Sequence, residues 1–248
     1  LFLKRLGVNE ITGFRWLDQP ENERRLDAEK LLTSLGALDS GGRLMEVGKK
    51  MAALPLHPRL AALVLQGGDC LGEVLFVAAA VQGEGVFKRA GRGQKWAEFL
   101  EGEPGWGNDF GAEWLAMMAA KNLDFRPREC DGLGVLARGA RETWKNFQQL
   151  GRLLKKRGGR IKEPDFRQRG DACARAMLIA FGDRLAVRRD QGSAVCHVVG
   201  GRKGKLHPKS VVRNTTLFLA ADMIEVEGRE RSVILSRCVE ISKDWIPA

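Results

Sequence analysis

The sequence has 248 residues, more than one typical small domain and enough for two compact domains or three small ones. Hydrophobic residues make up 44% and charged residues 29% of the chain, a balance that excludes a wholly disordered or collagen-like protein. Lys and Arg exceed Asp and Glu by 10, and no apolar run approaches the roughly 18–20 residues of a membrane helix.

Residues 1–54 have the pattern of a winged-helix module that the chain enters partway through. Pro20 and the acidic residues after it suit the first turn of a helix, and Gly36 suits its end. The apolar positions between them follow the spacing of one helix face: Ala28, Leu31, Leu32 and Leu35. Two short strands around the turn 40–42 and a helix over about 46–53 are expected next.

Residues 55–157 carry helical patterns only, so they predict a helical bundle. The longest apolar stripe runs from Leu133 to Leu154, and a row of cations lies about 140° away from it around the helix. That basic row consists of Arg138, Arg141, Lys145, Arg152 and Lys155. A glycine-punctuated loop over 83–93 adds three more cations, Lys88, Arg89 and Arg92. A solvated helix face is the alternative interpretation of the row.

Residues 158–164 are expected to be a linker, because two glycines and Pro164 interrupt the helical pattern. One short helix and then alternating β patterns follow, with a hairpin expected at Gly228-Arg229. Several short strands after one helix suit a small barrel such as an OB-fold. The expected fold is a multidomain α+β chain: a winged helix (1–54), a helical bundle (55–157) and a small OB-like β-barrel (165–248).

The positive charge is concentrated in the second half of the chain. Residues 121–170 have a net charge of +8 and residues 171–248 of +4, against +1 over 1–54 and −3 over 55–120. This excess favours a polyanion such as single-stranded nucleic acid, with a solubilising surface as the alternative. No segment pairs its basic residues with an exposed aromatic face, so a membrane partner is not expected.

The glycine-rich stretch 200–205 is the sharpest candidate for contacts to a nucleic acid. Its glycines let the backbone approach a phosphate closely, and it is expected to be a loop between two strands. The candidate residues are Arg202, Lys203 and Lys205, with Arg188 and Arg189 at the end of the preceding strand. Alternatively, Arg188 forms a structural ion pair and the loop is a solubilising hairpin tip.

No self-sufficient active site or metal site is found in the sequence, and no cofactor is expected in this chain. Gly204-Lys205 lacks the first glycine and the Ser or Thr of a P-loop, and the G-x-G-x-x-A pattern at 132–137 lies in a helical segment. His57 precedes Pro58, where a capping or packed histidine is expected. The five cysteines include no C-x-x-C, which predicts buried free thiols, a reducing compartment and hence a cytoplasmic protein.

Several segments resemble DEAH-type ATP-dependent RNA helicases, in the region after their second RecA-like domain. The chain has LGALD at 35–39 and LPLHPRL at 54–60, which match characteristic sequence motifs of that family. FGDRLAVRR at 181–189 and LHPKS at 206–210 resemble the family's FPDRVARRR and hPxS segments, most closely in the bacterial HrpB type. One departure is Gly182, where the family usually has Pro.

The resemblance implies that the three predicted domains are the winged-helix, ratchet (HA2) and OB-like domains of a helicase's accessory region. In related helicases this region encloses single-stranded RNA and couples RecA-domain motion to translocation. ATP, Mg²⁺ and the RecA-like domains are then expected in the parent chain, while this stretch alone is not expected to be an enzyme. The chain begins at Leu1 without a Met or a signal-peptide pattern, so we expect a piece of a longer protein. The alternative is a stand-alone winged-helix/OB nucleic-acid-binding or adaptor module without a motor.

Overall fold

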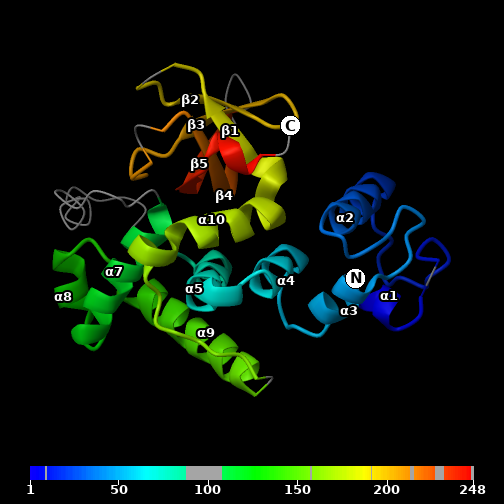
Figure 1. The fold of residues 1–248 in the computed structure, drawn as a ribbon, viewed down its shortest axis with the longest axis horizontal. Helices are drawn as coiled ribbons and strands as arrows, with labels where there is room; N and C mark the ends of the chain where they lie inside the picture. The colour runs from blue at the N-terminus through cyan, green and yellow to red at the C-terminus, as the bar shows by residue number, and fades with distance from the viewer. Residues whose placement is uncertain are drawn as a thin grey trace. The chain divides into compact units, whose positions relative to one another are not determined.

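The computed structural model describes residues 1–8, 10–87, 108–156, 158–190, 192–212, 215–226 and 232–246. The chain forms two compact units, Leu1–Gln66 and Gly67–Ala248 (Figure 1). The first unit is helical with one β-bridge, and the second combines helices with a closed β-barrel. The expected mixed α and β character is therefore confirmed, while the three-domain division with boundaries at 54 and 158–164 stays a prediction.

The first unit has the expected order of helix, turn and helix. Its helices are α1 (Phe2–Arg5), α2 (Asn22–Ser34), α3 (Glu46–Ala52) and α4 (Pro58–Leu65). The two strands expected between α2 and α3 are reduced to a single antiparallel bridge between Leu38 and Leu44. The Asp39 carboxylate accepts hydrogen bonds from the backbone N–H groups of Gly41 and Arg43, which closes the turn.

His57 caps the N-terminus of α4, as its position before Pro58 predicts. Its Nδ1 accepts a hydrogen bond from the backbone N–H of Arg59 at 3.3 Å. The imidazole therefore satisfies one of the first N–H groups of the helix, which have no partner within the helix itself.

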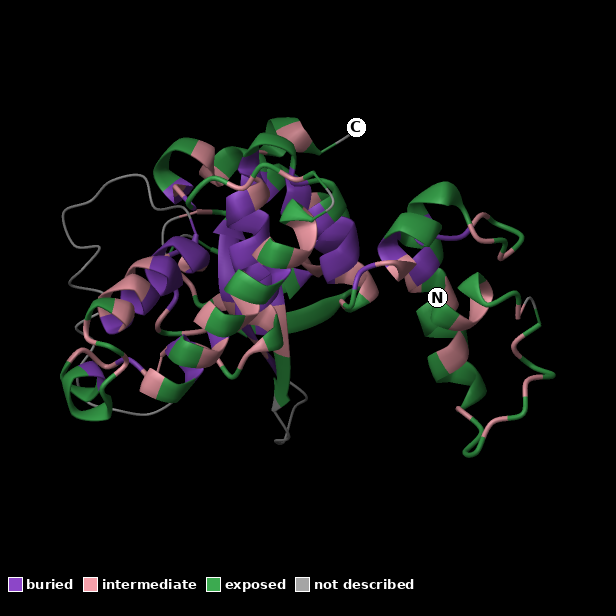
Figure 2. Cartoon of the chain, turned by 90° about the horizontal axis from the view of Figure 1, so that it is seen from below, coloured by how far each residue is buried: buried purple, intermediate pink, exposed green. Residues whose placement is uncertain are grey.

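The second unit begins with a layer of helices around one buried helix. The helices are α5 (Leu71–Gln82), α7 (Asp109–Asn122), α8 (Pro127–Gly132), α9 (Ala137–Lys155) and α10 (Phe166–Phe181), with a 3-10 turn η1 (Gly68–Cys70) before α5. Every residue of α5 from Gly72 to Ala80 is buried, because all of them are apolar except Glu73, which forms an ion pair with Arg169. Figure 2 shows buried residues in purple. The expected single stripe from Leu133 to Leu154 is divided: α8 ends at Gly132 and α9 begins at Ala137.

Aromatic side chains from four helices meet around Phe76 of α5. Its ring lies edge-on to those of Trp114, Phe147 and Phe166, with centroids 5.1, 6.3 and 6.0 Å away. These contacts tie α5 to α7, α9 and α10, and edge-to-face pairs stabilise by about 0.5–1.5 kcal/mol beyond the area that they bury.

Gly139 allows α9 to pack directly on the segment that follows α5. A Cβ at this position would lie 1.9 Å from the carbonyl oxygen of Gly85, a backbone atom that has no freedom to move away. The Leu136 N–H also donates a hydrogen bond to the Val86 carbonyl at 2.8 Å. The start of α9 is therefore fixed by backbone contacts.

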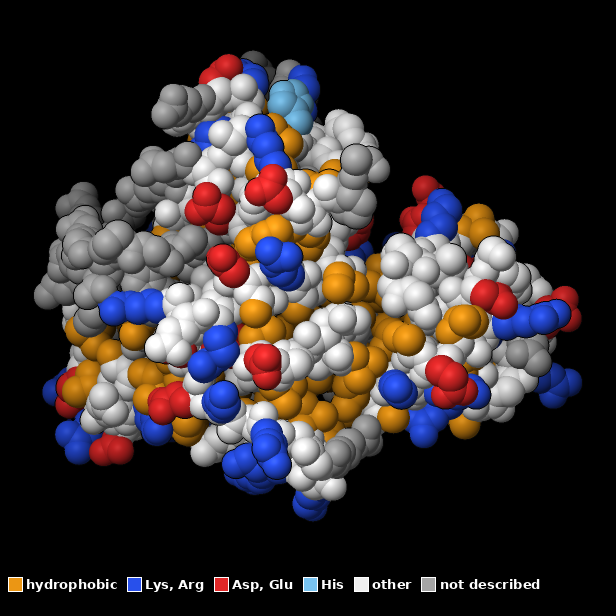
Figure 3. Space-filling view, in the orientation of Figure 1, with side chains coloured by type: hydrophobic (Ala, Val, Ile, Leu, Met, Phe, Trp, Pro, Cys, Tyr) orange, Lys and Arg blue, Asp and Glu red, His pale blue; other side chains and the backbone are white. Residues whose placement is uncertain are grey.

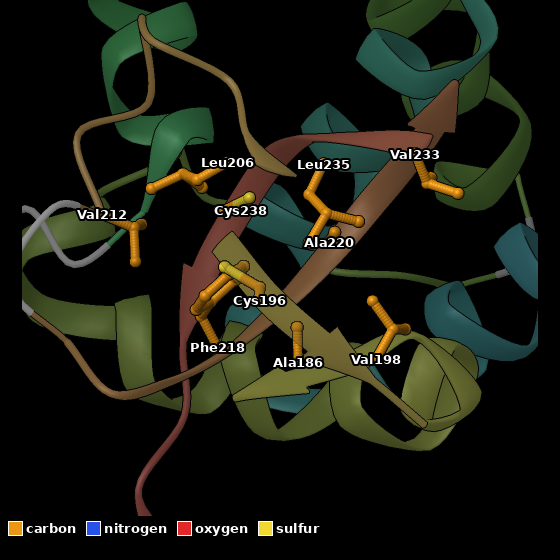
Figure 4. Close-up of a cluster of buried hydrophobic side chains, with 10 residues drawn as sticks. All are labelled: Ala186, Cys196, Val198, Leu206, Val212, Phe218, Ala220, Val233, Leu235 and Cys238. Carbon is orange, nitrogen blue, oxygen red and sulfur yellow. The ribbon is translucent and has the colours of Figure 1, made fainter. Parts of the chain in front are cut away.

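Five strands close into a barrel at the C-terminal end of the described chain. They are β1 (Leu185–Arg188), β2 (Val195–Val198), β3 (Arg202–Leu206), β4 (Leu217–Val226) and β5 (Ser232–Glu240), preceded by the turn η2 (Gly182–Arg184) and followed by η3 (Lys243–Trp245). The strand order is β1-β2-β3-β5-β4, with β1 paired to β4 and only the β3–β5 pair parallel. Alternating inward side chains, among them Phe218, Leu235 and Cys238, fill the interior (Figure 4).

The third strand was expected to be a loop, and that prediction is wrong. Arg202–Leu206 pairs with β2 on one side and with β5 on the other. Sequence analysis missed it because its two inward positions are Gly204 and Leu206, and a single apolar side chain makes no period-two signal. A Cβ at Gly204 would lie 3.0 Å from the Leu235 side chain, so glycine suits the packed interior.

Two acidic residues of α7 join the helical layer to the barrel. The half-buried Asp109 carboxylate accepts hydrogen bonds from the Ser210 hydroxyl and from the N–H groups of Val211 and Cys238, at 3.0, 2.7 and 2.7 Å. One turn later, Glu113 accepts two hydrogen bonds from Arg237 of β5, at 2.8 and 3.3 Å. α7 is therefore held on the barrel by charged groups, of which Glu113 and Arg237 are buried.

Arg237 is the centre of this contact. Its guanidinium also donates to Asp222 of β4 at 3.0 Å, so one cation faces two carboxylates. Its backbone has φ +51°, a left-handed conformation that costs a non-glycine residue about 1–3 kcal/mol. This backbone conformation interrupts the inward and outward alternation of side chains along β5, and the Arg237 side chain contacts α7.

In the described ranges, no single helix is long and apolar enough to cross a membrane. The bent pair of Pro58–Leu65 and Gly68–Gln82 reaches that length and composition only when its two parts are taken together.

We expect opposite effects from the same substitution at two glycines of α9. Gly139→Ala should lower the free energy of unfolding by about 1–3 kcal/mol, because the methyl group overlaps the Gly85 carbonyl. Gly151→Ala should raise it by up to about 1 kcal/mol, since a Cβ there has its nearest neighbour at 3.7 Å and alanine favours the helix. Urea unfolding of both variants measures the difference, and equal effects would contradict the close approach at Gly139.

The Asp109 carboxyl should make stability fall as the pH rises from about 4 to 6. Burial, partly offset by the hydrogen bonds from Cys238, Val211 and Ser210, raises its pKa from 3.8 to about 6. Between these pH values the folded chain keeps a proton that the unfolded chain releases. The stabilisation by the protonated Asp109 carboxyl is therefore complete below about pH 4 and is lost as the pH rises through about 6. The loss is about 3 kcal/mol at most.

The measurement is the difference in unfolding free energy between the native chain and Asp109→Asn at several pH values. Asparagine does not titrate, so the difference should shift in favour of the variant by up to about 3 kcal/mol between pH 4 and pH 7. A difference that stays flat across this range would contradict the raised pKa of Asp109.

Candidate nucleic-acid interface

Lys203 and Lys205 lie side by side on the outer surface of the barrel. They alternate along β3 with Gly204 and Leu206, which face the interior, so both ammonium groups point to solvent. In the part of the chain that the structure describes, neither ammonium has an ion-pair or hydrogen-bond partner. Two unpaired cations two positions apart on a rigid strand can contact neighbouring phosphates of a bound strand.

The neighbouring strand and turn add to this outer surface. His197 on β2 lies opposite Lys203 and is exposed, so an imidazole stands beside the cation pair. Gly200 and Gly201, at φ +82° and +77°, make the tight turn between β2 and β3. Both conformations are left-handed and favour glycine, so the two glycines serve the turn, and the cations themselves lie on the strand.

Arg202 begins β3 with its guanidinium turned to the protein. It is exposed, but its Nη2 donates a hydrogen bond to the Asp183 carbonyl at 3.2 Å. Of the three cations named in this stretch, Arg202 is therefore the one already engaged by the fold.

Arg188 does not lie on the surface, and it forms no ion pair in the described structure. It is 6% exposed, and its guanidinium donates to the backbone carbonyls of Thr215, Ser193 and Val212. Its Cζ also lies 5.9 Å from the centre of the Phe218 ring. Arg188 ties together the loops around β1, and both sequence-based interpretations of it, phosphate contact and ion pair, are corrected.

Of the remaining candidate cations, one is paired and three are not described. Arg189 is exposed and forms an ion pair with the neighbouring Asp190 at 2.6 Å. Lys88, Arg89 and Arg92 lie outside the described residues.

The basic row on α9 is partly engaged by the protein itself. Arg138 forms an ion pair with Glu84 at 2.7 Å, and Arg141 donates to the carbonyls of Asp124 and Phe125 at 3.3 and 3.4 Å. The other three cations of the row are exposed and have no partner among residues with a described position: Lys145, Arg152 and Lys155.

The space-filling view agrees with this division. Lys and Arg side chains are interspersed with Asp and Glu over most of the face drawn in Figure 3, and a group of basic side chains gathers at its lower edge, over the end of α9. Exposed cations without a nearby carboxylate are the ones whose counterions a nucleic acid can replace.

Helix α2 of the first unit offers no comparable surface. Arg24, Arg25 and Lys30 each form an ion pair with an acidic residue on or next to the same helix, at 3.0, 3.3 and 3.3 Å. A DNA-reading helix presents several groups to base edges, whereas this helix neutralises its own cations.

The thiols and the acidic groups form no recognisable centre in the described residues. The five cysteines are free and buried, as predicted, and burial raises the pKa of the Cys70 thiol to about 11. No group of three His, Cys, Asp or Glu residues in the described ranges has the arrangement to hold a metal ion.

The charged junction of α7 with the barrel was missed by sequence analysis. Glu113 and Arg237 are 124 positions apart, so no local spacing indicates their contact. The only local signal is that Arg237 is the one arginine among the mostly apolar residues of β5.

The comparisons with known proteins address the same segments. Residues 28–56 match the family described as helicase associated domain (HA2), winged-helix. The chain is 32% identical over 88 residues to the probable ATP-dependent RNA helicase DHR2 of Saccharomyces cerevisiae, covering 35% of this chain and 12% of that protein. The chain resembles the C-terminal region of a DEAH-type helicase. The sequence-based recognition of that family is therefore confirmed.

Two crystal structures of Escherichia coli HrpB are similar in fold over nearly the whole chain. One is described as a DExH-box NTPase, with TM-score 0.61 and 22% identity, and the other as a DEAH/RHA helicase, with TM-score 0.64 and 23% identity. They cover 98% and 99% of this chain, which spans only 24% and 25% of the solved chains. The described helices and barrel thus have the fold of part of a much longer helicase.

Replacing Arg188 should destabilise the chain far more than replacing its neighbour. Arg188→Met leaves three backbone carbonyls without their charged donor, which should lower the unfolding free energy by about 2–4 kcal/mol. Arg189→Met removes only an exposed ion pair and should change it by less than about 1 kcal/mol. Thermal unfolding of the two variants measures both effects. An Arg188→Met protein as stable as the native chain would refute the structural role of Arg188.

Proposed function

We propose that this chain is the nucleic-acid-binding accessory part of an ATP-dependent RNA helicase. In this proposal it holds single-stranded RNA along its basic surfaces and couples the motion of RecA-like domains to translocation. The observation that carries it is the pair Lys203 and Lys205, two exposed cations on one strand of a basic chain that have no ion-pair partner among the described residues.

A strand of RNA fits such a surface better than a specific duplex site does. Contacts from lysine to phosphate are independent of sequence, and single-stranded nucleic acid is commonly held by cations together with stacking side chains. The free cations of α9, Lys145, Arg152 and Lys155, would provide a second stretch of the same kind.

The fold supports the domain assignment on which this function rests. The closed order β1-β2-β3-β5-β4 with one helix before it is consistent with an OB-like barrel, a fold that binds oligonucleotides. We assign 1–54 to a winged helix, 55–157 to the ratchet domain and 165–248 to the OB-like domain. The cytoplasm is the proposed compartment, in line with five free thiols.

The motor and its cofactors belong to the parent chain in this proposal. ATP and Mg²⁺ would be bound by the RecA-like domains, because this sequence has no Walker motif. The printed descriptions of the yeast and E. coli relatives, an ATP-dependent RNA helicase and an NTPase, support this assignment.

The test is salt-dependent RNA binding by a charge-reversal variant. Lys203→Glu with Lys205→Glu should weaken binding of a fluorescein-labelled ten-nucleotide RNA and make the slope of log K against log salt shallower by about 1.4, or about 0.7 per lost phosphate contact. Anisotropy titrations at several salt concentrations measure both quantities.

The control carries the same change of net charge elsewhere. Lys30→Glu with Lys50→Glu alters two exposed lysines of the first unit and should leave the slope unchanged. An equal loss in both double variants would mean that only net charge matters. An unchanged slope in the β3 variant, with its melting temperature retained, would refute the proposed surface.

A further inference from the structure

A polar cavity of about 360 Å³ lies between α10 and the end of the barrel, away from the β3 cations. Its volume falls in the range of about 300–1,000 Å³ that small-ligand sites occupy. Residues of α10, the end of β5 and η3 line it, together with Asn108 just before α7. None of the functions assigned above uses it.

An aromatic wall is the first feature of this cavity. Trp245 of η3 and Phe166 of α10 line it, and the guanidinium of Arg175 lies 4.6 Å from the centre of the Trp245 ring. The Trp245 ring is half-buried and forms part of the cavity surface. An indole at a cavity wall is a platform on which a flat ring can stack.

Hydrogen-bonding groups of both kinds surround that platform. The Asn108 Oδ1 accepts the Gly111 N–H at 2.6 Å, so this buried side chain offers its amide N–H groups, and they lie toward Gly170 in the cavity wall. The carboxylates of Asp171 and Glu240 also line the cavity, and, counting described residues only, neither is in an ion pair. Arg167 and Ser242 line the cavity as well, so it presents both donors and acceptors, which suit a ring that has both amino groups and ring nitrogens or carbonyls.

Gly170 keeps one wall of the cavity open. It lies inside α10, where glycine costs about 1 kcal/mol relative to alanine. A Cβ there would have its nearest neighbour at 3.6 Å, an ordinary contact, so packing does not require glycine. By contrast, Gly72 and Gly139 face backbone oxygens at 2.2 and 1.9 Å from such a Cβ. Access to the cavity is a reason for glycine at position 170.

We propose that this cavity binds one unpaired nucleobase of the RNA strand, stacked on Trp245. The inference rests on the proposed function, because it takes the strand as the source of the base. The carboxylates of Asp171 and Glu240 accept from the amino group of the base, and the Asn108 amide donates to a ring nitrogen or carbonyl. The site thus adds base stacking to the phosphate contacts of the β3 surface.

The experiment compares the labelled ten-nucleotide oligo(A) with an RNA of equal length that carries abasic riboses. Trp245→Ala should weaken oligo(A) binding about 5- to 100-fold, the loss that one stacked base accounts for, and leave abasic RNA binding unchanged. Trp245→Phe should keep most of the affinity for oligo(A). Gly170→Leu should weaken oligo(A) binding as well, because it fills the cavity without removing the indole and with no loss of melting temperature.

The matched control is Trp144→Ala. This indole also has a cation over its ring, Lys121 at 4.2 Å, but it lies on α9 and not in the cavity, so the variant should bind oligo(A) like the native chain. Unchanged binding in folded Trp245→Ala and Gly170→Leu would overturn the proposal. So would a Phe variant as weak as the Ala variant.

Two further outcomes separate this proposal from others. If AMP competes with oligo(A) at an affinity equal to that of the strand, the cavity is a site for free nucleotides and the strand proposal is wrong. If the Trp245 variants are neutral while the Lys203 and Lys205 variant still weakens binding, the nucleobase site fails and the proposed function stands.

Discussion

The second unit depends on the buried charged contact between α7 and β5. Arg237 faces Glu113 and Asp222, and removing one partner of such a buried ion pair typically costs about 3–5 kcal/mol. The contact also offsets the left-handed backbone at Arg237, which the strand would not otherwise adopt. With Asp109 accepting three hydrogen bonds one turn away, helices and barrel form one body. The free cations of α9 and of β3 are therefore carried on a common rigid frame.

Positive charge in this chain serves two different purposes. Arg188 and Arg237 are buried, where their guanidinium groups organise backbone carbonyls and carboxylates. Lys203, Lys205 and Lys145 are exposed lysines, and their ammonium groups can exchange counterions for the phosphates of a nucleic acid. The net charge of +10 thus overstates the surface available to a nucleic acid, because some of its arginines hold the fold together.

The candidate surface could be predicted in part. Sequence analysis named all the cations of β3 and α9 that have no partner among the described residues, because charge and helical spacing can be read directly from the amino-acid sequence. It also named Arg188, whose burial depends on carbonyls 5 to 27 positions away. The stacking cavity has no local signal, since Asn108, Gly170 and Trp245 come together only when α10 packs across the end of β5.

The sequence by itself determined the helical and β-rich stretches, the turn at 40–42, the position of His57 before a helix and the free thiols, because these follow from local spacing and residue type. Its motifs also showed the resemblance to DEAH-type helicases. Only the tertiary structure decided that 202–206 is a strand, that the helix expected from Leu133 begins at Ala137, and which cations are buried. The physical reason is the same in each case. Strand pairing, backbone approach at Gly139 and desolvation of a charge depend on groups that are distant along the chain and adjacent only in the fold.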